Sequence, residues 1–392
     1  MLEFQGKHGK AKVMIDDIDQ STISQIYEFL NHEVFTNPIV IMPDTHAGNG
    51  AVIGFTMEMT DKVIPNVVGV DIGCGMRSIN VGKGLLAEHT KSDIDAIIRK
   101  NIPFGTLVHN KNHFDLRQEK SFWDICNSQL RSFVMKYNKR YMEQYDIPKY
   151  SFDWLEKKCS DIKIDLDRVV KSIGTLGGGN HFIEISKAQN TGDYWITVHS
   201  GSRQFGLKIA TYWQKKAGKG SLSHLEGDNM FGYLRDMLFA QCYAEVNRGY
   251  MVNTICDLLD LEKQEDISSV HNFIDFDDFI IRKGAIRSYS DEKMIIPFNM
   301  EDGILICMGK SNPDWNFSAP HGAGRLGSRR WAKETLNLDD AKHRMEKNNI
   351  FFSTLPKDEL KGAYKDPSII ESAIEPTAII IDRLKPIIAM KD

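Results

Sequence analysis

Residues Val67 to Met76 read VVGVDIGCGM, a short apolar run that three glycines interrupt and that carries an aspartate and a cysteine. Glycine interrupts both helices and strands, because it offers no side chain to pack and loses much conformational freedom on folding. Asp71 and Cys74 stand three residues apart and do nothing for the core of a strand. The composition of this stretch therefore indicates a role beyond packing.

Loops of the same kind recur along the chain, and each pairs a potential ligand with glycine. Glycine permits a positive φ and lets backbone N–H groups approach a phosphate or a metal closely. Ligands on such turns converge more readily than ligands in the middle of a helix or strand. The loops are PDTHAGNG (Pro43–Gly50), VDIGCGM (Val70–Met76), GGGNHF (Gly177–Phe182), VHSGSR (Val198–Arg203) and APHGAGR (Ala319–Arg325), and VHNF (Val270–Phe273) adds a histidine without glycine.

The spacing of apolar residues predicts a mixed α/β or α+β fold with helical insertions. Short apolar runs between glycines predict strands and turns at the start of the chain, such as Ile39–Met42, and a short strand at Trp195–His199. Apolar residues four apart predict one long helix. The predicted helices are 93–102 behind a cap at Ser92, 121–145, 230–261 and 331–349, and residues 173–185 are predicted as a glycine-rich loop.

Composition excludes several classes of protein. The 392 residues carry a net charge of -4, which gives no general attraction to nucleic acid or to an anionic membrane. The first residues, MLEFQGKHG, contain no apolar signal region, and no apolar run approaches the length of about 18 residues that spans a membrane. We therefore expect a cytoplasmic protein with no membrane partner. Six widely spaced cysteines without a CxxC pair fit buried, reduced thiols.

Each candidate residue has an ordinary structural explanation when it is taken alone. Cys74 is typical of a small buried hydrophobic residue, and His46 and His199 are typical of hydrogen-bonded structural histidines. Asp71 can cap a turn. The three glycines of Gly177–Gly179 match neither a P-loop nor a dinucleotide-binding motif.

Taken together, an aspartate, a cysteine and three histidines are the residue types that bind transition metals. Five ligands exceed what one tetrahedral site needs, so the set favours two metals that share a ligand, and a thiolate can bridge them. Cys74 would then have to be ionised at neutral pH. A thiolate favours zinc, whereas the carboxylate and the imidazoles leave manganese, iron and cobalt open.

His321 lies in the loop HGAGR, four residues before Arg325. This spacing suits a loop that holds a phosphate against an imidazole nitrogen. A neutral imidazole can attack phosphorus and form a phosphoramidate when metals and a guanidinium neutralise the developing charge. A sixth metal ligand and a general base are the alternatives for His321, and the loop alone leaves them open.

In these motifs the chain resembles the RtcB family of GTP-dependent RNA-splicing ligases. The family's motifs stand in its order from Met42 to Lys391, as PDTHAGNG, NVVGVDIGCGM, GTLGGGNHFIEI, VHSGSRQFG, HNF, RKGA, APHGAGRLGSR and RLKPIIAMKD. The resemblance implies a single compact α/β domain over residues 1–392, with the metals in a central cleft. It also implies that the aspartate and the cysteine of VDIGC are metal ligands.

The resemblance assigns roles to individual residues. His321 would be the catalytic residue that becomes guanylylated, and Arg203 and Arg325 would hold phosphates. Two Mn²⁺ ions would be bound, one by Asp71, Cys74 and His181 and the other by Cys74, His199 and His271. Contacts to the guanine nucleotide would come from Asn180, His181, Phe182, Ile183, Glu184, His271, Asn272, Pro297, Phe298, Asn299, Met300, His321, Gly322, Ala323, Gly324 and Lys391.

The implied reaction joins RNA ends in RNA repair or tRNA splicing. The histidine takes GMP from GTP and passes it to an RNA 3′-phosphate, which can arise from a 2′,3′-cyclic phosphate. A 5′-hydroxyl then displaces GMP. The RNA would meet a basic patch at Arg325, Arg329, Arg330 and Lys333, for which a solvated helical face is the alternative. The need for an activating protein partner stays open.

Two other functions fit the same residues. A metal-dependent phosphoesterase would act on RNA end phosphates with His321 as a general acid or base and without guanylylation. A non-catalytic RNA-end binder would keep the metal cluster for stability.

The chain departs from the family at two points near the expected nucleotide. Pro297-Phe298-Asn299-Met300-Glu301 stands where the family has PGSMG, and Pro320 replaces the commoner cysteine before the histidine. Asn299 could replace one hydrogen bond of the missing serine. These differences concern the nucleotide preference and the RNA ends accepted, and they leave the metal ligands intact.

Overall fold

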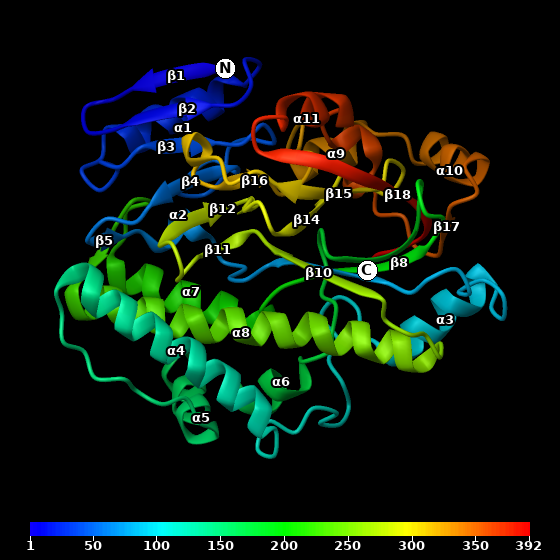
Figure 1. Cartoon of the computed structure of the whole chain (residues 1–392), viewed down its shortest axis with the longest axis horizontal. Coiled ribbons are helices and arrows are strands. Elements are labelled where there is room, and N and C mark those ends of the chain that lie inside the picture. The colour runs from blue at the N-terminus through cyan, green and yellow to red at the C-terminus, as the bar shows by residue number, and fades with distance from the viewer.

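Two β-sheets form the centre of the computed structural model, which describes residues 1–392 (Figure 1). The first sheet has six strands in the order β1-β2-β3-β4-β12-β11, and only the pair β2–β3 is parallel. Its strands are β1 (Leu2–Gln5), β2 (Lys10–Val13), β3 (Ile39–Ile41), β4 (Phe55–Glu58), β11 (Asn272–Ile274) and β12 (Ile280–Lys283).

The second sheet has eight strands along the path β10-β6-β8-β7-β18-β15-β14, with β17 added to β18 in parallel. Its strands are β6 (Gly75–Asn80), β7 (Phe182–Ala188), β8 (Tyr194–Ser200), β10 (Glu265–Val270), β14 (Lys293–Pro297), β15 (Ile304–Gly309), β17 (Phe351–Phe352) and β18 (Ala378–Met390). Two small sheets pair β5 (Lys62–Val63) with β9 (Leu225–Glu226) and β13 (Ala285–Arg287) with β16 (Ser318–Pro320).

Helices flank the strands on two sides, with α4 to α8 below them and α9 to α11 above them in Figure 1. A core of 52 buried residues joins the six-stranded sheet to the lower helices, because their apolar faces pack together there. The helices are α1 (Gln20–Leu30), α2 (Pro65–Val68), α3 (Lys91–Asn101), α4 (Lys120–Tyr141), α5 (Phe152–Asp161), α6 (Leu166–Lys171), α7 (Arg203–Ala217), α8 (Gly227–Leu258), α9 (Arg329–Thr335), α10 (Leu338–Lys347) and α11 (Pro367–Ala373), with single 3₁₀ turns η1 (Pro313–Trp315), η2 (Lys357–Glu359) and η3 (Lys361–Ala363).

The predicted fold class is confirmed, since strands and helices mix along the whole chain. The long helix predicted from apolar spacing is α8, which has 32 residues and lies against α4 and α7. The helix predicted at 121–145 is α4, and the strand predicted at Trp195–His199 is β8. All six cysteines are free and buried, as predicted. No helix combines the length and the apolar composition needed to cross a membrane.

Two secondary-structure predictions are wrong because side-chain caps were overlooked. The start of the chain contains α1, which begins where the Asp19 carboxylate accepts the Thr22 N–H at 3.0 Å. The segment 331–349 forms two helices, because the Asn337 side chain accepts the N–H groups of Asp339 and Asp340 and so begins α10. A capping residue in mid-segment outweighs continuous helical spacing here.

Two boundaries are also wrong. The cap of α3 is Thr90 and not Ser92, because Thr90 and Asp93 exchange side-chain and backbone hydrogen bonds in a capping box. The segment 182–185, predicted as loop, belongs to β7, since its backbone pairs with β8 and β18.

Candidate active site

The VDIGCG turn connects α2 to β6 and packs directly on α8. Gly73 has a φ of 71°, and a Cβ atom there would lie 3.1 Å from the α8 backbone. The Gly73 N–H donates to Asn272 O at 2.7 Å, and the Cys74 N–H donates to Asp71 O at 3.1 Å. The glycine therefore lets the turn hold Asp71 and Cys74 close to the segment that carries His271.

Neighbouring strand ends bring the three histidines to this turn. His199 on β8 lies opposite Met76 on β6, and His181 immediately precedes β7, which pairs with β8. His271 follows β10, and its N–H donates to Cys74 O at 2.9 Å. The strand order β10-β6-β8-β7 thus gathers ligands that are far apart in sequence.

Two groups of side chains meet at the turn, and Cys74 belongs to both. The Cys74 Sγ lies 3.2 Å from His199 Nε2 and 3.6 Å from His181 Nε2. His199 Nε2 is 3.3 Å from His271 Nε2, and His181 Nε2 is 3.0 Å from Asp71 Oδ2. Within each group, the ligand atoms lie within 4.8 Å of one another, in the sets Cys74, His199, His271 and Asp71, Cys74, His181.

The hydrogen bonds of the Nδ1 atoms indicate which ring nitrogens carry a proton and therefore what the Nε2 atoms present to the cluster. His181 Nδ1 lies 2.9 Å from Leu176 O, and His199 Nδ1 lies 3.0 Å from Asn180 O. A carbonyl oxygen only accepts, so each Nδ1 carries the proton and each Nε2 presents a lone pair to the cluster. Lone pairs, a thiol sulfur and a carboxylate that converge in this way fit cations between them. The buried Nδ1 of His271 has no partner.

Burial also sets the protonation of the cluster. It lowers the pKa values of His199 and His271 well below the usual range, so both rings are neutral. Burial, together with the Asp71 carboxylate, raises the pKa of the Cys74 thiol. A cation at the sulfur would reverse that shift, because a coordinated thiol ionises. The donor set therefore fits divalent metal ions of the first transition row.

Helix α8 supports the cluster from below through two buried side chains. The Arg248 Nη1 donates to Gly73 O at 2.6 Å and to Ser200 O at 2.9 Å, which joins the turn before β6 to the end of β8. The Asn247 amide accepts from the Gly174 N–H at 2.8 Å and donates to Gly201 O at 3.1 Å. Both side chains are buried, and neither belongs to the apolar four-residue spacing that predicts this helix from sequence.

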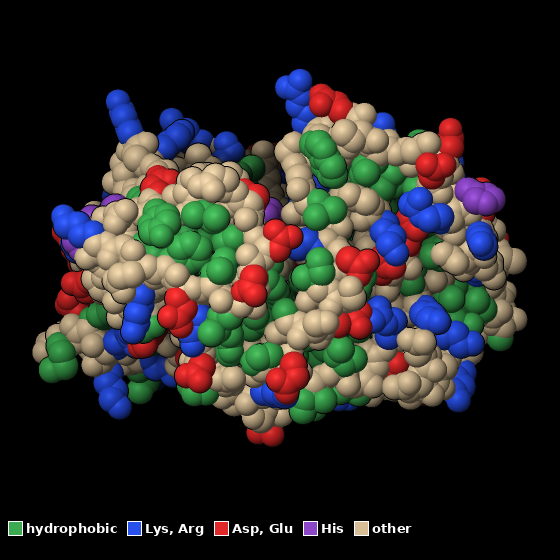
Figure 2. Space-filling model, turned by 90° about the horizontal axis from the view of Figure 1, so that it is seen from above, with side chains coloured by type: hydrophobic (Ala, Val, Ile, Leu, Met, Phe, Trp, Pro, Cys, Tyr) green, Lys and Arg blue, Asp and Glu red, His purple; other side chains and the backbone are tan.

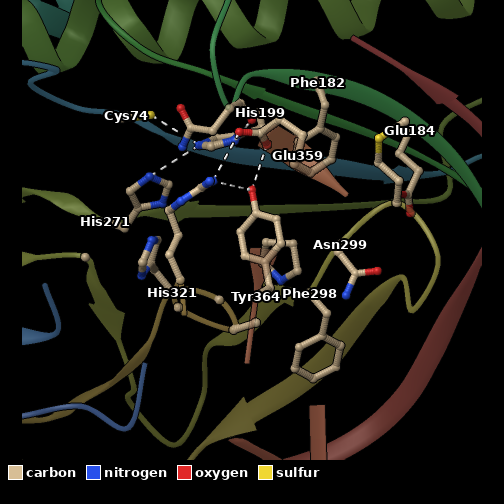
Figure 3. A pocket seen from close by; sticks show the side chains of 18 of the residues that line it. Cys74, Phe182, Glu184, His199, His271, Phe298, Asn299, His321, Glu359 and Tyr364 are labelled. Atoms are coloured by element: carbon tan, nitrogen blue, oxygen red, sulfur yellow. Dashed lines mark hydrogen bonds and ion pairs between the residues drawn. The ribbon is translucent and has the colours of Figure 1, made fainter. Parts of the chain in front are cut away.

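A cavity of about 250 Å³ opens beside the cluster (Figure 3). His199, His271 and Cys74 lie together at one side of the view, and Glu184, Phe298 and Asn299 lie toward the other. Of the residues named from sequence as ligands or nucleotide contacts, all but His181 and Arg203 line it, namely Asp71, Cys74, Asn180, Phe182, Ile183, Glu184, His199, His271, Asn272, Pro297, Phe298, Asn299, Met300, His321, Gly322, Ala323, Gly324, Arg325 and Lys391.

His321 lies next to His271 at the edge of the cluster (Figure 3). Its ring centre is 4.8 Å from that of His271. The fully buried Asp44 holds it, because Asp44 Oδ2 lies 2.5 Å from His321 Nδ1 and accepts the His321 backbone N–H at 3.2 Å. The carboxylate keeps the proton on Nδ1 and leaves the Nε2 lone pair free. In this orientation the His321 ring can act as a nucleophile, a base or a metal ligand, and Asp44 holds it in place.

Burial raises the pKa of Glu184 to about 7, against the opposing effects of a hydrogen bond from Ser186 and the charge of Lys391. Its side chain lines the cavity on the same side of the view as Phe182, away from Cys74 and His271 (Figure 3). Burial likewise lowers the pKa of His46 to about 4, and its Nδ1 lies 3.1 Å from Asp44 O. His46 lines the cavity, although its motif alone indicates a structural role.

The loop that replaces the family's PGSMG stretch is closed on itself. The Asn299 Oδ1 accepts the N–H groups of Glu301 and Asp302 at 3.0 Å, and its Nδ2 donates to Asp302 Oδ2 at 2.7 Å. Glu301 forms two hydrogen bonds with Arg344, and Asp302 pairs with Lys361. The Asn299 amide is thus engaged within its own turn.

Some of the predicted cationic residues lie away from the cavity or are already paired. Arg203 donates to Thr175 Oγ1 at 3.0 Å and to Gly105 O at 2.9 Å and does not line the cavity. Arg330 is 87% exposed and pairs with Glu334. Arg329 lines the cavity but is paired with two carboxylates.

Glu359 and Tyr364 also line the cavity, and sequence reasoning missed both. They lie in a charged segment without a glycine beside a ligand, so the pattern that marked the other loops is absent there. Asp44 was missed for a different reason, since it stands in a marked loop in which only the histidine was considered.

The comparisons with known proteins agree with this site. The sequence model of the family described as "tRNA-splicing ligase RtcB" matches residues 25–392. The "RNA-splicing ligase RtcB" of Escherichia coli (strain K12) is 28% identical over 383 residues, which cover 90% of each chain. The "tRNA-splicing ligase RtcB" of Nanoarchaeum equitans is 23% identical over 453 residues, covering 95% of this chain and 91% of the relative. The chain therefore belongs to the RtcB family of tRNA-splicing ligases.

Proposed function

We propose that this chain is an RNA ligase that uses GTP and two Mn²⁺ ions and works through a histidine–GMP intermediate. It joins RNA ends with a 3′-phosphate or 2′,3′-cyclic phosphate to ends with a 5′-hydroxyl. One observation carries the proposal: two candidate metal-binding groups share Cys74, and the ring centre of His321 lies 4.8 Å from that of His271, a member of one group.

His321 is the nucleophile in the first step. Its Nε2 lone pair attacks the α-phosphorus of GTP, the nitrogen–phosphorus bond forms, and the bond to the pyrophosphate oxygen breaks. Pyrophosphate leaves with the electron pair. The Asp44 carboxylate, bound to Nδ1, stabilises the positive charge that develops on the ring.

Asp71, Cys74 and His181 would hold one Mn²⁺, and Cys74, His199 and His271 the other. When bound, the two ions neutralise charge on the phosphate oxygens during in-line displacement. The protein contributes a dry, shaped wall, because four of these five side chains are at most 5% exposed.

The far half of the cavity suits a purine base. Phe182 offers an aromatic ring, and the ionised form of Glu184 accepts N–H groups. The Lys391 ammonium donates hydrogen bonds only, so it suits a base carbonyl such as that of guanine.

RNA would enter a cavity whose surroundings are not broadly basic. Figure 2 shows blue and red side chains interspersed over the face in view, and the net charge is -4. The RNA phosphate is therefore held by the metal ions and by local cations such as Arg325, and binding should weaken as salt rises.

The first test is labelling with α-³²P GTP and Mn²⁺. We expect a labelled protein that His321→Ala abolishes, while His343→Ala, an exposed histidine on α10, keeps the label. RNA with a 3′-phosphate and a 5′-hydroxyl should then become longer. RNA that loses its end phosphate without any protein label would favour a phosphoesterase instead.

A further inference from the structure

Glu359 is a buried carboxylate that contacts four donors in the cavity wall. Its Oε1 accepts from Arg329 Nη1 at 2.6 Å and from Arg325 Nη1 at 3.4 Å. Its Oε2 accepts from Lys391 Nζ and the Tyr364 hydroxyl at 2.6 and 2.7 Å. The side chain is 1% exposed, so water does not compete for these bonds.

The donors reach Glu359 from three stretches of the chain, one of which, with Tyr364, is its own. Arg325 ends the HGAGR loop, Arg329 begins α9, and Lys391 follows the last strand, β18. All of them line the same cavity (Figure 3). The Glu359 carboxylate therefore binds both Arg325, on the loop of His321, and Lys391, in the half of the cavity proposed to hold the base.

This arrangement limits how Lys391 can point. One N–H of its ammonium is committed to Glu359, and the Nζ stands 3.5 Å from Asn180 O and 5.5 Å from the Phe182 ring. A lysine head on a four-carbon stem is otherwise free to rotate. With one bond fixed, the remaining N–H groups keep a defined direction.

We propose that Glu359 is a positioning residue for nucleotide recognition. It orients the Lys391 ammonium toward a hydrogen-bond acceptor on the base, and it fixes Arg325 and Arg329 relative to Lys391. The inference rests on the proposed function, because it takes the bound nucleotide to be a guanine nucleotide. A purely structural ion pair would stabilise the wall without affecting the choice of base.

The test is equilibrium binding of two nucleotides to the full chain with Mn²⁺. GMP carries the base carbonyl, whereas 2-aminopurine riboside monophosphate lacks it and reports its own binding by fluorescence. We expect Lys391→Met to lower the preference for GMP by about tenfold, the worth of a hydrogen bond to a charged group. Glu359→Gln should lower the same preference by a similar factor, and the double variant should be no worse than either single change.

A matched control is Asp236→Asn, because Asp236 is also a buried carboxylate, bound to Lys158 and Arg235, but it does not line the cavity. It should keep the preference of the unchanged chain. If Glu359→Gln does not fold, Glu359→Asp retains the charge but is one methylene too short to hold both ends, and it should lose the preference too.

The outcomes separate the two proposals. If a folded Glu359 variant keeps the preference for GMP, or if its effect multiplies with that of Lys391→Met, the positioning role is overturned. If the unchanged chain binds neither nucleotide, the proposed function fails first.

Discussion

At the scale of single residues, the site depends on which side chains keep or lose a proton. Cys74 is the only thiol among the ligand atoms and the only residue common to both groups. Burial raises the pKa of the Cys74 thiol, so the thiol would ionise only with a cation bound to the sulfur. A metal ion in either group would in turn be bound by the thiolate form. Charge and metal are therefore linked through one atom.

Cys74→Ala is expected to remove at least one of two bound metal ions and to abolish labelling by GTP. The fold should survive, because the change removes one sulfur beside a cavity rather than an element of the core. Elemental analysis of the purified protein measures the metal. Cys307→Ala, a buried cysteine on β15, should keep both ions, and an unchanged metal content in Cys74→Ala would contradict the bridging role.

Glu184 gives a pH dependence with a defined sign. Its pKa is about 7 in the folded chain and near 4.5 in the unfolded chain. Between these values the folded chain binds the proton more tightly, so the free energy of unfolding falls as pH rises, by up to on the order of 3 kcal/mol. Guanine nucleotide binding should change in the opposite direction, because only the carboxylate accepts the N–H groups of the base.

Denaturant titrations and nucleotide-binding measurements between about pH 5 and pH 8 measure the two effects. Glu184→Gln cannot ionise, so both pH dependences should flatten. Nucleotide binding that weakens as pH rises through about 7 would contradict this role for Glu184.

At the scale of elements, the loop between β14 and β15 forms part of the cavity wall and is built around Asn299. Its amide closes the turn, and Glu301 and Asp302 fasten the loop to α10 and η3. The hydrogen bond that Asn299 could offer in place of serine is therefore used inside the loop. The loop would act on a bound nucleotide through its shape, since Phe298 and Met300 line the cavity.

Asn299→Ala should cost about 1 kcal/mol in unfolding free energy and weaken GTP binding several-fold, because the turn loses its internal hydrogen bonds. The metal content should stay the same. Asn312→Ala is the control, since the Asn312 side chain caps η1 in a similar turn that does not line the cavity. Equal nucleotide binding by the two variants would show that the loop does not shape the pocket.

At the scale of the whole molecule, α8 connects the helical layer to the metal cluster. Arg248 is fully buried and ties the turn before β6 to the end of β8, and Asn247 ties the loop before β7 to the same place. The cluster is thus held from the helical side as well as by the sheet. Metal binding and global stability should depend on each other.

Arg248→Met should lower the free energy of unfolding by about 3–5 kcal/mol, because the buried carbonyls and Glu245 lose a charged partner. Metal affinity should fall with it, since both turns lose their common support. Arg131→Met, at an exposed position on α4, should change neither. Titration with Mn²⁺ measures the metal affinity, and thermal unfolding measures the stability. If the free energy of unfolding falls as expected but the metal affinity is unchanged, the two are not coupled.

The sequence by itself determined the long helix α8 and which residues were candidates for the cluster that the fold brings together. Glycine beside aspartate, cysteine or histidine is a local signal, because the close approach that a site needs restricts the backbone at that point. The apolar stripe of α8 is equally local, since every fourth residue must meet the core. A capping residue in the middle of a segment, such as Asn337, is a local signal too, and in the structure it overrides continuous helical spacing.

Tertiary structure alone decided the partners. The strand order β10-β6-β8-β7 is not the order of the chain, so which histidine meets which side of Cys74 follows from strand pairing. Glu359 and Tyr364 line the cavity, and Arg203 binds the Thr175 hydroxyl and the Gly105 carbonyl, because a buried charge takes the nearest compensating group once water is excluded. That choice depends on distances across the fold, which no local pattern encodes.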